Sequence, residues 1–180
     1  NSENDNFNLT ERKSYDKYSI IDDRMIDKEI RQRKNCLKSL ESQMLVYNEV
    51  LEQSKFEKNN IDNSLSEICA QFDLSNLDSQ ISYQKKNIQK NELEIEMFNN
   101  LKNLNHKIET DQSISKNDQI IKIQNQFINY IENDSVTEID ESNIQEKIDQ
   151  LTRILSEFYD YVKNNNIQID LNGSNQSLPI

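Results

Sequence analysis

Glycine and proline are almost missing from this sequence. Its single glycine, Gly173, and its single proline, Pro179, both lie within the last eight of the 180 residues. Sheets and compact α/β folds need tight turns, and glycine reaches the positive φ angles of such turns at the least steric cost. A body of 172 residues without either residue therefore predicts long, uninterrupted helices and an all-α fold.

Apolar side chains are scarce as well. Hydrophobic residues make up 34% of the chain and charged residues 29%, tryptophan is absent, and the mean hydropathy is -0.92. This composition cannot fill a wide globular core, but it suffices for narrow seams between helices. Since no apolar run approaches the ~20 residues of a transmembrane helix, we expect no membrane span.

The residues that usually carry catalysis are few. The only histidine, His106, has no cysteine or second histidine near it in the sequence, so it makes a poor zinc site. Phosphate-binding loops need glycines that the body of the chain lacks. Cys36 and His106 lack the third, orienting group of a catalytic triad. We interpret acidic pairs such as Glu94 with Glu96 as solvated faces. No enzyme activity, cofactor or metal site is expected.

The two cysteines indicate a reducing environment. Cys36 and Cys69 are 33 residues apart, which on one continuous helix is about 50 Å. A disulfide needs Cα atoms within roughly 7 Å. We therefore expect two free thiols and an intracellular location, cytoplasmic or nuclear.

The charge of the chain disfavours nucleic acid as a direct partner, because the net charge is -11. One local exception is a basic cluster near the start of the first helix. We interpret it as a solvated face, with a docking patch for an acidic partner as the alternative. Its members are Arg24, Lys28, Arg31, Arg33, Lys34 and Lys38.

A heptad stripe runs from Ile26 to Phe72 in steps of alternately three and four residues. Eleven of its fourteen positions are apolar, and its period of 3.5 residues is that of a coiled coil. The fourteen positions are Ile26, Ile30, Arg33, Leu37, Leu40, Met44, Tyr47, Leu51, Ser54, Lys58, Ile61, Leu65, Ile68 and Phe72.

Two places weaken this stripe. Arg33 occupies a seam position, and we expect its aliphatic stem to lie on the seam while its guanidinium reaches water. Ser54 and Lys58 soften one heptad and precede two asparagines, which are poor helix formers. A break at 58–63 is one interpretation, but the unbroken register favours a continuous helix.

Three further helices are expected. The second should end near Thr110, and its apolar stripe shifts register before it resumes at Met97. The third, capped by Ser115 and Asp118, carries apolar residues on more than one face, which predicts at least two neighbouring helices. The last, ending at Asn164 to Asn166, has the most regular stripe, here called the C-terminal seam. The C-terminal seam consists of Ile144, Ile148, Leu151, Leu155, Phe158 and Val162.

These elements divide the chain into four parts. Residues 1–18 should form a flexible polar arm, 19–111 a long coiled-coil hairpin, 112–165 a C-terminal helical pair and 166–180 a flexible tail. The predicted architecture is thus all-α: an antiparallel hairpin of elongated coiled-coil helices plus a shorter two-helix bundle. The chain begins at Asn1 rather than Met, as expected of an excised fragment or a processed form.

The expected function is a non-enzymatic coiled-coil scaffold or tether subunit in a larger intracellular complex, of the cytoskeletal, chromosome-segregation or vesicle-tethering type. Its partners would be other helical proteins or a second copy of the chain, bound through coiled-coil seams. We expect the stripe at Leu40, Met44, Tyr47 and Leu51 to face the second helix, and the C-terminal seam to bind the partner. The alternative is a stand-alone helical recognition module, secreted or surface-exposed, that binds a host or matrix protein.

Overall fold

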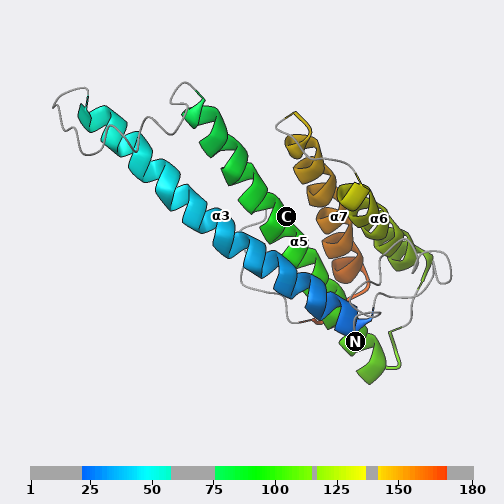
Figure 1. Cartoon of the computed structure of the whole chain (residues 1–180). Coiled ribbons are helices and arrows are strands. Elements are labelled where there is room, and N and C mark those ends of the chain that lie inside the picture. Colours follow the sequence, from blue (N-terminus) through cyan, green and yellow to red (C-terminus); the bar gives the residue numbers. More distant parts are fainter. Residues whose placement is uncertain (1–21, 58–75, 115–116, 137–141, 170–180) are drawn as a thin grey trace.

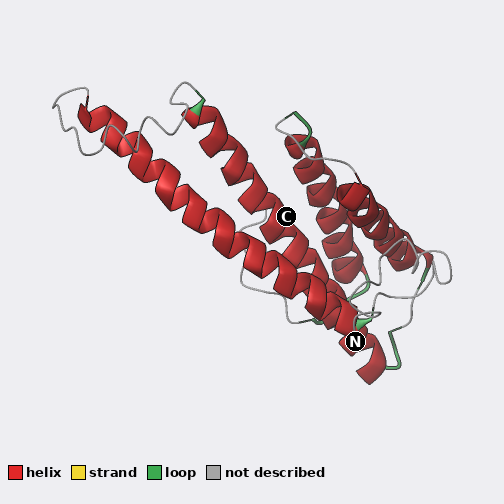
Figure 2. Cartoon of the chain, in the orientation of Figure 1, coloured by secondary structure: helices red, strands yellow, loops and turns green. Residues whose placement is uncertain are grey.

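The computed structural model describes residues 22–57, 76–114, 117–136 and 142–169. These residues form four helices: α3 (Asp23–Glu57), α5 (Leu77–Thr110), α6 (Asp118–Val136) and α7 (Ile144–Asn164). Figure 2 shows helices and loops but no strand in the described residues. The predicted all-α class is confirmed.

Polar side chains define several of the helix ends. Asp22 Oδ1 accepts a hydrogen bond from the backbone N–H of Met25 at 3.0 Å and so caps α3. Asn117 caps α6 by accepting from two backbone N–H groups at 3.0 and 3.1 Å, and the predicted cap residue Ser115 lies outside the described residues. Asn166, with a φ of 53°, ends α7 in the left-handed conformation that asparagine tolerates, close to the predicted end.

Helices α3 and α5 lie side by side and run antiparallel (Figure 1). Near the start of α3, Asp27 pairs with Lys102 at 2.7 Å, and further along α3 Gln43 accepts a hydrogen bond from Gln84 at 3.0 Å. The segment that joins the two helices falls within 58–75, outside the described residues. The continuity of the first helix through 58–63 and the turn of the predicted hairpin therefore stay predictions.

Helices α6 and α7 cover the second half of α5. Figure 1 shows α7 beside α5 and α6 beside α7, at one end of the long α3/α5 pair. Residues of all four helices join in one core cluster, from Ile26 of α3 through Phe98 of α5 and Phe127 of α6 to Phe158 of α7. Helix α6 contacts both α5 and α7, as its wide apolar circumference predicts: Phe98 and Phe127 pack edge to face with ring centroids 4.8 Å apart.

A smaller cluster lies further along the pair, where α3 packs on the first turns of α5. Its buried members are Met44, Val50, Leu77 and Ile81, and Tyr47 and Leu51 pack against them. Together with Leu40, which is 8% exposed, these residues place the predicted stripe of α3 inside the chain. The molecule is therefore a four-helix core from which a two-helix portion extends.

Candidate functional site

The C-terminal seam lies inside this core. Its six side chains are between 0 and 7% exposed and pack with residues of the other three helices. A partner could reach them only by displacing α5 or α6. This burial corrects the expectation that the C-terminal seam is an interaction surface. The six residues are Ile144, Ile148, Leu151, Leu155, Phe158 and Val162.

Helix α5 carries charged side chains into the core. Glu94 is 1% exposed, and Lys90 and Glu96 are each 5% exposed, so the expectation of a solvated acidic face at Glu94 and Glu96 is wrong. The two glutamates are two residues apart, which places them about 200° apart around the helix. They consequently face different neighbours: Glu94 contacts α3 and α6, while Glu96 contacts α7.

Glu94 is the centre of a buried polar network, here called the Glu94 network. Arg33 donates from Nε to Glu94 Oε1 at 2.9 Å, Lys90 Nζ lies 3.0 Å from Oε2, and the Tyr130 hydroxyl also donates to Oε2. Glu29 pairs with Arg33 Nη1 one turn away on α3. Three helices thus meet at one carboxylate, since Arg33 belongs to α3, Lys90 to α5 and Tyr130 to α6.

The sequence predicted that the guanidinium of Arg33 reaches water. It lies in the core instead. Its side chain is 13% exposed, and its Cζ lies 4.9 Å from the centroid of the Phe98 ring, a cation–π distance. The stem does follow the α3 seam, but acidic partners on two helices hold the charged end inside. Glu29 lies one helical turn from Arg33, but the pairing with Glu94 could not be predicted locally, because Glu94 lies 61 residues further along the chain.

The charges of the Glu94 network stabilise one another. Burial alone would raise the pKa of Glu94, but Arg33, Lys90 and the Tyr130 hydroxyl outweigh it and hold that pKa below its ordinary value. Burial alone would lower the pKa of Arg33, yet Glu94 and Glu29 raise it. Two basic side chains, Arg33 and Lys90, thus face two carboxyl groups, those of Glu94 and Glu29.

A second polar contact joins α5 to α7. Tyr159 donates its hydroxyl hydrogen to Glu96 Oε2 and accepts a hydrogen bond from Asn100 Nδ2 at 2.9 Å. Burial and the bond to Glu96 raise the pKa of Tyr159 above its ordinary value. Asn100 is fully buried, and its side-chain oxygen has no hydrogen-bond partner. This contact fixes the position of α7 along α5.

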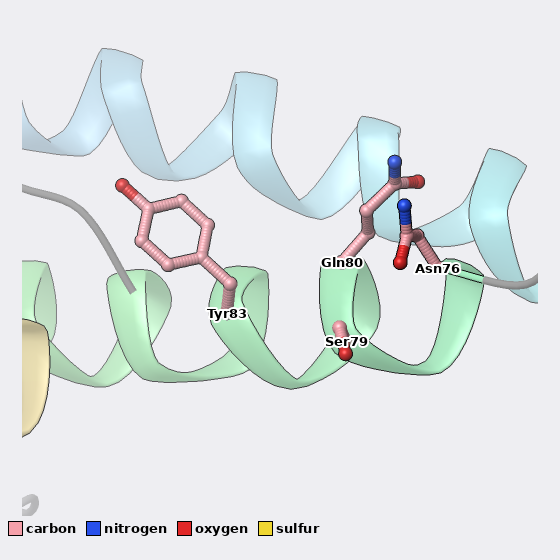
Figure 3. Close-up of a pocket in the computed structure, with 4 residues that line it drawn as sticks. All are labelled: Asn76, Ser79, Gln80 and Tyr83. Atoms are coloured by element: carbon pink, nitrogen blue, oxygen red, sulfur yellow. The ribbon is translucent and has the colours of Figure 1, made fainter. Parts of the chain in front are cut away.

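Neither polar cluster opens into a described pocket. A pocket lies elsewhere, at the start of α5, where Asn76, Ser79, Gln80 and Tyr83 line it beside α3 (Figure 3). Among the lining residues that the structure describes, Tyr83 is the only titratable side chain. Buried and already paired, Glu94 and Glu96 are suited to holding helices together rather than to proton transfer with a substrate.

The other candidates from the sequence stay apart. Cys36 is a free, exposed thiol on α3, and Cys69 lies outside the described residues. His106 is exposed near the end of α5. In the part of the chain that the structure describes, no three His, Cys, Asp or Glu side chains gather into a metal-binding group.

An exposed apolar pair lies on the side of α3 that faces away from its buried stripe. Leu45 is 70% exposed and Val46 is 46% exposed. They follow the basic cluster along α3, of which Arg24, Arg31, Lys34 and Lys38 are exposed. The heptad stripe does not include this pair, because Leu45 and Val46 lie off the seam positions. Two adjacent apolar residues off the seam could have indicated an exposed apolar patch.

No relative points to a function for this arrangement. Comparison with known proteins finds no matching family model, no similar curated protein and no similar solved structure. Among the described helices, none combines the length and the apolar character needed to cross a membrane. The surface of the chain itself is therefore what indicates a function.

Proposed function

We propose that this chain is a non-enzymatic assembly subunit whose α3/α5 pair makes the contact with its partner. The observation that supports this most is the 70% exposure of Leu45 in a chain with few apolar residues. The four-helix core supplies stability, and the two-helix portion presents a surface that the core does not need. An exposed leucine beside an exposed valine is a small patch, which suits a long and narrow helical interface.

The interior polar clusters favour the same proposal. The Glu94 network and the Glu96–Tyr159 contact hold the core together. Their carboxylates already bind partners inside the chain. Buried networks of this kind fix which side chains meet, and hence how one helix is placed against the next. A scaffold needs that property, because its binding surface must keep one shape.

The mass of the chain's complex in a native extract tests this proposal. A tagged full-length chain should elute from size exclusion well above the 21.3 kDa of one chain. Leu45→Glu should shift it toward lower mass without changing its thermal unfolding. The matched control is Thr152→Glu, an equal charge change at an exposed position on α7, which should leave the mass unchanged.

A chain that elutes alone in the extract would contradict the assembly role. The stand-alone recognition module predicts that the chain elutes alone and that the isolated monomer binds an external protein. If Leu45→Glu and Thr152→Glu behave alike in a large complex, the assembly role stands and Leu45 is not its contact.

A further inference from the structure

The face of α3 that points away from α5 has a repeat of its own. Steps of three and four residues connect eight positions along it, all of them exposed except the half-buried Lys28. A period of 3.5 residues keeps such positions on one line along a helix, so they could face a second helix along its length. We call this line the outer face of α3. It consists of Lys28, Arg31, Asn35, Lys38, Ser42, Leu45, Glu49 and Glu52.

Charge is separated along the outer face of α3. Its first half is basic, with Arg31 and Lys38, and its last two positions are acidic, Glu49 and Glu52. Arg31 and Glu49 form no ion pair with any residue in the described part of the chain. Glu52 makes only an exposed contact of 3.8 Å with Lys55. The face is therefore a row of positive groups followed by a row of negative groups.

Such a row is complementary to itself when it is reversed. We propose that a second copy of this chain binds antiparallel along the outer face of α3, an inference that rests on the assembly role proposed above. A two-fold axis near Lys38 and Ser42 sets Arg31 of each copy against Glu49 of the other. The same register sets Leu45 against Asn35. Interfaces of this isologous kind are the commonest in symmetric oligomers.

The apolar pair fits this arrangement. Leu45 and Val46 of one copy lie opposite Lys34, Asn35 and Lys38 of the other, where the methylene stems of the lysines cover apolar surface while their ammonium groups stay in water. A uniformly acidic partner would suit Arg31 but would be repelled by Glu49 on the same face. Another copy of the chain matches both halves in one register.

The structure also leaves room for the second copy. Among the described helices α3 packs against α5, and α6 and α7 lie on the far side of α5 (Figure 1). In this register the two copies of α3 overlap along their whole length, and the four-helix cores lie at opposite ends of that overlap. Exposed ion pairs are individually weak and are screened by salt. The dimer should therefore be salt-sensitive.

Sedimentation velocity of the purified full-length chain tests the inference. We expect a dimer at about 0.05 M salt that dissociates toward monomer at about 1 M salt. Arg31→Glu alone and Glu49→Arg alone should each raise the dimer Kd at least about tenfold, because each places like charges opposite one another. An equimolar mixture of these two variants should restore dimers, since every facing pair is then of opposite sign.

The double variant Arg31→Glu/Glu49→Arg should dimerise with itself as the unmodified chain does. Arg153→Glu, the same charge reversal at an exposed position on α7, is the matched control and should leave the Kd unchanged. Circular dichroism of each variant should show unaltered helix content and melting temperature, because all three positions are exposed.

Three outcomes overturn the inference: a monomer at every salt concentration, single variants that dimerise normally, or a mixture that fails to recover. A monomer that binds poly-glutamate through Arg31 would point to an acidic partner instead. If the purified chain is monomeric while the extract still holds it in a larger complex, self-association fails and the assembly role survives. If the purified chain is a dimer but elutes from the extract as a single chain, self-association stands and the assembly role fails.

Discussion

Arg33 of α3 and Glu94 of α5 form an ion pair inside the core, with Nε and Oε1 2.9 Å apart and side-chain exposures of 13% and 1%. Neither charge would be stable in this position alone, because removing an unpaired ion from water costs several kcal/mol. A slip of α3 along α5 by even one turn would break this pair and leave each charge only the partner on its own helix, Glu29 for Arg33 and Lys90 for Glu94. The pair therefore favours one alignment of the two long helices over its neighbours.

Truncation of Glu94 should destabilise the protein strongly. Glu94→Ala leaves Arg33 and Lys90 buried without their shared carboxylate, which by analogy with other broken buried pairs costs about 3–5 kcal/mol. Urea unfolding followed by circular dichroism measures this loss. Glu157→Ala, at an exposed position on α7, should change the free energy of unfolding by no more than about 0.5 kcal/mol. Equal effects of the two substitutions would refute a stabilising role for the Glu94 network.

Stability should fall in acid because of Glu94. Its pKa is lower in the folded state than its ordinary value of 4.5, so the unfolded chain binds a proton more readily. The contribution of Glu94 is therefore present above about pH 4.5 and is lost as the pH falls through the folded-state pKa. Urea midpoints from pH 6 downward should show a shallower acid decline for Glu94→Gln than for the unmodified chain.

Alkaline stability should depend on Tyr159. Burial and the hydrogen bond to Glu96 raise its pKa, so the folded state keeps its proton where the unfolded chain loses it. Its contribution is present below about pH 10 and is lost as the pH rises through the raised pKa. Tyr159→Phe should flatten the decline above pH 10. Tyr161 serves as the comparison, because burial alone raises its pKa. Tyr161→Phe should flatten the decline less.

The C-terminal seam should behave as core. Leu151 is fully buried, so Leu151→Asp places a charge among apolar side chains and should unfold the isolated chain or lower its melting temperature sharply. Ser156→Asp introduces the same group at an exposed position of α7 and should leave the melting curve near its original place. If the Leu151→Asp chain stays folded and only loses binding to a partner, the C-terminal seam is an interaction surface and not core.

The two sides of α3 should respond differently to the same substitution. Leu40 is 8% exposed and Leu45 is 70% exposed. Leu40→Ala should lower the free energy of unfolding by about 2–3 kcal/mol, the lower part of the range for a buried leucine. Leu45→Ala should leave stability almost unchanged and weaken association instead. Thermal unfolding and sedimentation, measured on both variants, separate the two effects.

The helices could be predicted because their signals are local. The absence of glycine and proline, the 3.5-residue stripe of α3 and the C-terminal seam each depend on residues close together in the sequence. The stripe also identified which side of α3 is buried at Leu40 and Met44. Local signals could not reveal that α7 packs inside the chain, because a regular apolar stripe looks the same whatever covers it.

The polar interior was missed for a physical reason. Glu94 and Glu96 look like solvated residues in a polar stretch, and their burial depends on three other helices that pack on the same turns of α5. Each of those helices covers a different side, so the apolar residues of α5 do not form one clean stripe. A weak periodicity in a long helix therefore signals either exposure or contact with several neighbours, and the sequence of α5 alone does not separate them.

The central place of α5 also has a consequence for synthesis. Helix α5 leaves the ribosome before α6 and α7, so Met97 and Leu101 are complete while the helices that cover them are not. At ~5–20 residues per second, the interval between Thr110 and Asn164 is roughly 3 to 11 seconds. During this time the nascent chain exposes the apolar side chains of α5 that later join the larger core cluster. A chaperone that binds apolar helices would find its target in that interval, and would release it once α7 arrives.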